Sequence, residues 1–105
     1  MVSPVIKNNI ERIGELCKKN RVLKLYAFGS VCTTGFSPLS DIDLIVDFKE
    51  NLEPIEQGEA WWNLFYEFKD LFHREIDLLV GKSLKNPYLI KEINKTKELL
   101  YGGQG

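Results

Sequence analysis

The sequence predicts an α/β fold in which a small mixed β-sheet packs with helices, in the order α-β-β-α-β-α. Residues 22–28 are apolar at every position except Lys24, a pattern typical of a central strand covered on both faces. Two stretches, 4–18 and 55–72, carry apolar side chains at three- and four-residue spacing, as amphipathic helices do. Residues 42–46 and 76–80 share the pattern Ile-Asp-Leu-X-Val, which suggests neighbouring strands with matched acids.

The first half of the chain is predicted to be a helix followed by two strands. Ser3 and Pro4 form a good helix start, as N-cap and first helical residue, and this helix is expected to end near residues 18–20. The first strand spans Val22 to Phe28. The turn-forming residues Gly35, Ser37, Pro38 and Ser40 indicate a loop before the second strand, which opens with Asp41-Ile42-Asp43.

The second half is predicted to be helix, strand and helix. Pro54 opens a helix from about Ile55 to Phe72, and Glu75 to Val80 forms the third strand. Asn86-Pro87 begins a last helix, in which Leu89, Ile93, Thr96 and Leu100 share a face, and residues 101–105 are expected to fray. We expect one domain covering residues 1–105.

Composition disfavours several classes of partner. The chain has 105 residues with 14 basic and 15 acidic side chains, a net charge of −1, so no overall positive field draws it to nucleic acid or to a membrane. No apolar run approaches the roughly 20 residues that span a bilayer. Cys17 and Cys32 form neither a disulfide framework nor, with one histidine, a zinc site. We expect a cytoplasmic protein.

The candidate site lies between the first two strands. Gly29-Ser30 directly follows the first strand, and a turn without a Cβ lets a phosphate approach the backbone closely. Asp41 and Asp43 are two residues apart, so in a strand their carboxylates share a face. Paired carboxylates repel unless a cation lies between them, and oxygen ligands suit Mg²⁺. The alternatives are that the acids simply open a solvated strand and that Ser30 caps a helical turn.

Gly29-Ser30, ten residues and then Asp41-Ile42-Asp43 resemble the signature of the minimal nucleotidyltransferases (MNT) of the polymerase-beta-like superfamily, which include antitoxins of HEPN/MNT toxin-antitoxin systems. The resemblance covers most of the chain. It implies a third acid on a later strand, and Asp77 fits that place. It also implies that Gly29 and Ser30 bind the nucleotide, and that Asp41, Asp43 and Asp77 are the catalytic and metal-binding residues, holding two Mg²⁺ ions.

The implied activity is transfer of a nucleoside monophosphate, AMP from ATP, to a hydroxyl. A HEPN-type toxin is the partner protein that the resemblance suggests. Relatives often carry arginine soon after the Gly-Ser pair, whereas this chain continues Val31-Cys32-Thr33. Lys82, Lys85 or a partner would then supply the positive charge, or activity is reduced.

Other readings stay open. The chain could be a non-catalytic, antitoxin-like binding module with a vestigial nucleotide site, or, less in keeping with its short length, an aminoglycoside-modifying or nucleic-acid-extending enzyme. Trp62 and Tyr66 form a second helical stripe with Ile55, which either packs under another helix or contacts a protein. His73 is expected to complement a helix dipole at a C-terminus. The acceptor, the preferred base and the oligomeric state, including a homo-oligomer, are not determined by the sequence.

Overall fold

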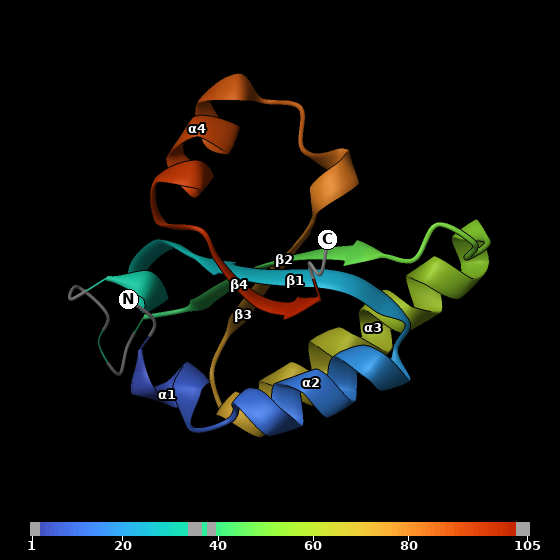
Figure 1. Cartoon of the computed structure of the whole chain (residues 1–105), viewed down its shortest axis with the longest axis horizontal. Coiled ribbons are helices and arrows are strands. Elements are labelled where there is room, and N and C mark those ends of the chain that lie inside the picture. The colour runs from blue at the N-terminus through green and yellow to red at the C-terminus, as the bar shows by residue number, and fades with distance from the viewer. Residues whose placement is uncertain (1–2, 34–36, 38–39, 103–105) are drawn as a thin grey trace.

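The computed structural model describes residues 3–33, 37 and 40–102 and has three layers. Helices α2 and α3 cover one face of a four-stranded sheet, and α4 lies over the other face (Figure 1). The elements in chain order are α1 (Pro4–Lys7), α2 (Ile10–Lys19), β1 (Val22–Phe28), the 3₁₀ turn η1 (Gly29–Cys32), β2 (Ile42–Phe48), α3 (Pro54–Phe72), β3 (Ile76–Val80), the 3₁₀ turn η2 (Gly81–Ser83), α4 (Pro87–Thr96) and β4 (Glu98–Gly102).

The sheet is mixed, with the strand order β3-β2-β1-β4. Strand β1 lies in the interior and pairs antiparallel with β2 and β4, while β2 and β3 are parallel. The β2–β3 register runs from Ile42 opposite Ile76 to Val46 opposite Val80. The two similar sequence segments therefore lie side by side, residue for residue, and their acids are matched as predicted.

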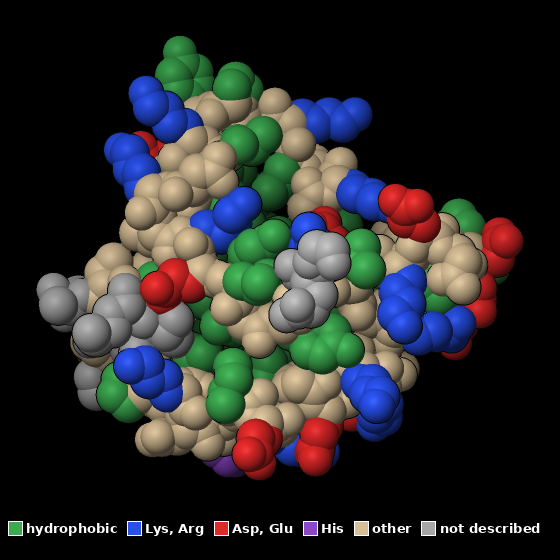
Figure 2. Space-filling view, in the orientation of Figure 1, with side chains coloured by type: hydrophobic (Ala, Val, Ile, Leu, Met, Phe, Trp, Pro, Cys, Tyr) green, Lys and Arg blue, Asp and Glu red, His purple; other side chains and the backbone are tan. Residues whose placement is uncertain are grey.

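Alternation along the strands separates two faces of the sheet. The face toward α2 and α3 carries the main core, in which Leu25, Leu44 and Val46 pack with Ile13 and Phe68. On the face toward α4, the buried cluster among the described residues is smaller and consists of Phe28, Ile45 and Ile93. Figure 2 shows that the surface is hollowed between α4 and the sheet, with hydrophobic side chains inside the hollow.

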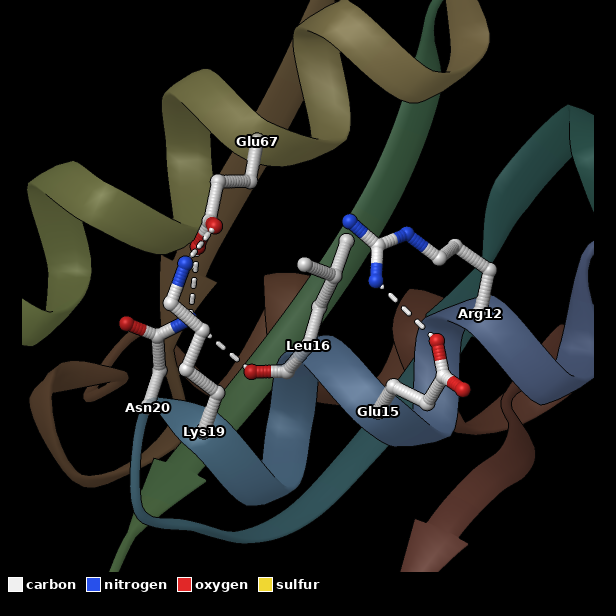
Figure 3. Close-up of polar contacts among 6 residues, drawn as sticks. All are labelled: Arg12, Glu15, Leu16, Lys19, Asn20 and Glu67. Atoms are coloured by element: carbon white, nitrogen blue, oxygen red, sulfur yellow. Dashed lines mark hydrogen bonds and ion pairs between the residues drawn. The ribbon is translucent and has the colours of Figure 1, made fainter.

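A polar cluster joins the end of α2 to the middle of α3 (Figure 3). The buried Asn20 donates from Nδ2 to the Leu16 carbonyl and to Oε1 of Glu67, both at 2.8 Å, and Lys19 forms an ion pair with Glu67. Although burial opposes it, these two donors hold the pKa of Glu67 below its ordinary value. The cluster fixes α2 against α3 on the face away from α4.

The predicted fold class is confirmed, and the structure changes two of its details. The first predicted helix is interrupted at Asn8 and Asn9 into α1 and α2, and the Ser3 side chain makes no cap hydrogen bond. The last helix ends at Thr96, and the predicted frayed end is wrong up to Gly102, because Glu98–Gly102 forms β4 against β1. In the described part of the chain, no helix is long and apolar enough to cross a membrane.

Candidate active site

The turn after β1 requires a glycine for two reasons. Gly29 has φ +73°, in the left-handed region that glycine adopts without a steric penalty. A Cβ at this position would lie 2.6 Å from Oδ2 of Asp43, so the carboxylate occupies the space that a side chain would fill. The Gly29 N–H donates to Oγ1 of Thr96 at 2.8 Å. The sequence predicted that a phosphate can approach the backbone at this turn, but the Gly29 N–H is already bonded to the end of α4.

Asp43 and Asp77 lie directly opposite each other in the parallel strands β2 and β3. Adjacent strands are about 4.8 Å apart, and paired side chains point to the same face, which here is the face covered by α4. Asp43 is half-buried, while Asp77 is exposed. Asp41 is also exposed and lies one residue before β2, so it is not part of the strand that the sequence predicted.

The three acids interact electrostatically. Burial, then the negative charge of Asp77, then that of Asp41 raise the pKa of Asp43 from 3.8 to about 6. Both neighbouring carboxylates therefore lie close enough to Asp43 to disfavour its ionised form. The arrangement favours an added positive charge.

The backbone on both sides of Asp41 is anchored to the start of β3. Arg74 donates from its guanidinium to the carbonyls of Ser37, at 2.8 Å, and Ser40, at 3.0 Å. On the other side, the Ile42 N–H donates to the Glu75 carbonyl at 3.1 Å. Asp41 thus lies between two residues bonded to the segment 74–75. Sequence reasoning missed this role of Arg74, because nothing in the pattern links it to the loop.

A further acid, Glu98, lies near the Gly29–Cys32 turn. Burial, followed by the charge of Glu98 and a hydrogen bond to it, raises the pKa of Cys32 to about 11, and the charge of Asp43 contributes to the same shift. Glu98 was missed because the segment was predicted to be helical. Acids around this turn repel a triphosphate unless cations accompany it.

The donor set fits a divalent cation that prefers oxygen. Asp41, Asp43 and Asp77 offer only carboxylate oxygens. Burial is the main cause of the raised pKa of Asp43, and the charges of Asp77 and Asp41 add to it a repulsion that a cation would relieve. Within residues 3–33, 37 and 40–102, no three His, Cys, Asp or Glu side chains already surround a common point at ligating distances. Asp43 and Asp77 are register partners, and Asp41 lies close enough to Asp43 for its charge to contribute to the raised pKa.

The other predicted residues fall in different places. Ser30 begins η1 with Gly29, and its carbonyl accepts from the N–H and hydroxyl of Thr33 at 3.0 Å. Lys82 lines the hollow under α4, together with Lys97, which sequence reasoning missed. His73 is the left-handed C-cap of α3. Trp62 and Tyr66 are 54% and 59% exposed, so no helix of the described chain covers them.

Comparison with known proteins identifies the family. Residues 11–104 match the family described as "Polymerase beta, Nucleotidyltransferase", so the chain belongs to this family and is a nucleotidyltransferase. A protein of Methanocaldococcus jannaschii named "Putative protein adenylyltransferase MJ0126" is 31% identical over 87 residues, which cover 83% of each chain.

Two solved structures have the same fold. One, a toxin-antitoxin with AMP-PNP, is 26% identical with a TM-score of 0.71, over 91% of this chain and 75% of the other. A chain from the tri-AMPylated Shewanella oneidensis HEPN toxin in complex with MNT antitoxin is 24% identical with a TM-score of 0.65, over 93% and 73% of the two chains. The resemblance to MNT proteins noted in the sequence is confirmed. Nucleotidyltransferases of this family generally use divalent metal ions.

Proposed function

We propose that this chain transfers AMP from ATP to a hydroxyl group of a partner protein and releases pyrophosphate. The observation that carries the proposal is the register pairing of Asp43 with Asp77 beside the Gly29 turn. It places two acids on one face, next to a backbone turn too tight for any side chain.

In this reaction a bond forms between the acceptor oxygen and the α-phosphorus, and the bond from the α-phosphorus to the pyrophosphate oxygen breaks. The proton of the hydroxyl passes to the carboxylate of Asp77. Asp77 is exposed on β3, an edge strand of the sheet, so an acceptor on another protein can approach it from outside. Gly29 and Ser30 lie beside the phosphates, next to Asp43.

Asp41, Asp43 and Asp77 are the residues that would hold two Mg²⁺ ions, which neutralise phosphate charge and clamp the attacking and leaving oxygens when bound. The segments anchored by Arg74 and Glu75 hold Asp41 in place, and the pairing of β2 with β3 fixes Asp43 against Asp77. The protein contributes mainly by orienting the reacting groups and by neutralising their charge, and these effects can lower the activation barrier by several kcal/mol.

The partner we propose is a HEPN-type toxin. The named relatives support a protein acceptor, and one solved neighbour contains an AMPylated HEPN toxin bound to an MNT antitoxin. On this chain, the exposed side chains Trp62, Tyr66 and Ile55 of α3 form the surface that we assign to the contact, since aromatic side chains contribute strongly to interfaces.

The test is to co-express this chain with the HEPN protein encoded beside it and to weigh the HEPN protein intact by mass spectrometry. We expect one or more additions of AMP with the wild-type chain and none with the Asp41→Asn, Asp43→Asn double variant. The exposed aromatic surface also favours a second candidate, a binding module that acts by covering its partner. A HEPN protein that is bound and inhibited, yet never gains the mass of AMP with ample ATP and Mg²⁺, would establish this second function.

A further inference from the structure

The hollow between α4 and the sheet is a cavity of about 330 Å³, within the size range of small-molecule sites. Its lining includes Tyr26 of β1 and Ile45 of β2, which are register partners, and Ile93 of α4. These three side chains form an apolar slot between sheet and helix. Figure 2 shows hydrophobic side chains in the depth of this hollow.

The cavity adjoins the candidate active site along β2. Residues 43, 45 and 47 are alternate residues of β2 and therefore share a face. At a rise of ~3.3 Å per residue, the backbone position of Ile45 lies about 6.6 Å from that of Asp43, and the position of Asp47 about 13 Å from it. Ile45 and Asp47 both line the cavity. A molecule that has its reacting atom at Asp43 and extends along β2 would reach the cavity at Ile45, two residues further along the strand.

The end of α4 connects the cavity to the Gly29 turn. Thr96 accepts the hydrogen bond from the Gly29 N–H at 2.8 Å, and the next residue, Lys97, lines the cavity with its ammonium 4.6 Å from the centre of the Tyr26 ring. Lys82 adds a second cation to the lining, and Asn94 adds an amide that both donates and accepts. The cavity therefore combines apolar walls, an aromatic ring, two cations, the carboxylate of Asp47 and one amide that both donates and accepts.

We infer that this cavity binds the nucleoside half of the nucleoside triphosphate, with its base in the slot between Tyr26, Ile45 and Ile93 and with Lys97 facing the phosphates. The inference rests on the proposed function and names the part of the site that selects the donor. Lys97 then supplies the positive charge that the sequence lacks after Gly29-Ser30. The acceptor is assigned to the side of Asp77, which is exposed on the edge strand β3 and open to a second protein.

The slot is tested by filling it. Ile90 lines the cavity and is only partly buried, so Ile90→Trp places an indole in the hollow without entering the main core. Leu89→Trp adds the same ring to the adjacent, exposed residue of α4, which does not line the cavity, and is the matched control. Calorimetry with Mg²⁺ compares ATP, which has a nucleoside, with inorganic tripolyphosphate, which has none.

We expect Ile90→Trp to weaken ATP binding by about tenfold or more, the loss expected when a base no longer stacks in its pocket. Tripolyphosphate binding should not change, and Leu89→Trp should bind both ligands as the wild type does. Equal ATP affinity in Ile90→Trp and wild type overturns the inference, as does equal weakening by the two tryptophan variants. Thermal unfolding checks that each variant is folded.

A second pair of variants tests the charge. Lys97→Met keeps most of the side-chain length and removes the ammonium, while Lys95→Met does the same to a lysine of α4 that pairs with Glu92 at 3.0 Å. We expect Lys97→Met to weaken ATP and tripolyphosphate alike by about fivefold, as for a partly exposed charge pair, and Lys95→Met to leave both unchanged. Equal affinities in the two variants overturn the assignment of Lys97.

The outcomes also separate this inference from the proposed function. ATP binding that depends on the slot, without AMP reaching any partner protein, contradicts the function and retains the cavity assignment. Normal AMP transfer by Ile90→Trp contradicts the cavity assignment and retains the function. A wild-type chain that binds neither ATP nor tripolyphosphate overturns both.

Discussion

The two faces of the sheet differ in what their side chains do, although both are built by the same strands. In β2, Leu44 and Val46 are 1% and 0% exposed and pack into the main core under α2 and α3. The alternate residues of β2, on the opposite face, are Asp43, Ile45 and Asp47, of which only Ile45 is buried. Because successive side chains of a strand point to opposite faces, one face of β2 carries the buried apolar core that stabilises the fold. The other face carries acids that repel one another, beside an open cavity.

The largest expected effect is on activity, through the acids. Replacing Asp41 and Asp43 by asparagine should lower AMP transfer by at least about a hundredfold, the order seen when one electrostatic group of an active site is lost. With metal chelated, the free energy of unfolding should stay the same or rise, because the repulsion around Asp43 is relieved. Urea denaturation measures this. A double variant that is clearly less stable would mean that these acids support the fold.

The next effect compares the same substitution on the two faces. Ile13 and Ile93 are 1% and 3% exposed, one in the main core and one in the small cluster under α4. Ile→Ala in a core costs about 2–5 kcal/mol, and less where the surroundings can collapse. We expect Ile13→Ala near the upper end and Ile93→Ala near the lower end, as measured by urea denaturation. Equal losses would show that α4 is packed as firmly as α2.

A smaller effect is expected at the turn that joins the two faces. Gly29→Ala forces a Cβ into a positive φ and against Asp43, so we expect a loss of about 1–2 kcal/mol from the left-handed backbone alone. Nucleotide binding should fall as well, because the carboxylate must move. Gly58→Ala is the control: this glycine lies in α3 with no atom within 4 Å of an added Cβ, so alanine should stabilise by about 0.5–1 kcal/mol. Thermal unfolding measures the stability of the two variants, and calorimetry measures their nucleotide binding. If Gly29→Ala behaves like Gly58→Ala, the turn is not constrained as described.

The sequence predicted what depends on local pattern and missed what depends on distant pairing. The bounds of β1 were predicted correctly, because a segment that is apolar except for Lys24 lies between turn residues. The alignment of Asp43 with Asp77 followed from two similar segments that pair in register. In contrast, Leu100 continues the helical spacing of α4, and only pairing with β1, which brings Leu25 opposite Tyr101, makes this segment a strand.

The same limit explains the missed site residues. Thr96, Lys97 and Glu98 lie at the junction of α4 and β4, so their closeness to the Gly29 turn depends on where that helix ends. Arg74 reaches carbonyl groups more than thirty residues away in sequence, and backbone acceptors leave no mark on sequence pattern.

The smallest expected effect is a dependence of stability on pH that has opposite signs on the two sides of the sheet. The pKa of Asp43 is raised from 3.8 to about 6 by burial and by the charges of Asp77 and Asp41. The folded state therefore holds a proton that the unfolded state has released between about pH 4 and pH 6, so this group's contribution to stability is lost as pH rises through that window.

Glu67, between α2 and α3, has a lowered pKa, and its contribution has the opposite sign, because stability is lost as pH falls. The measurement is thus the difference between wild type and Asp43→Asn, by urea denaturation with metal chelated, from pH 4 to pH 8. We expect the variant to gain stability relative to wild type as pH rises to about 6 and the difference to level off above it. Asp70→Asn, which removes an exposed acid of α3, should keep the wild-type profile. A constant difference between wild type and Asp43→Asn across this range would mean that neither burial nor the neighbouring carboxylates raise the pKa of Asp43, and the pKa would no longer support a cation among the three acids.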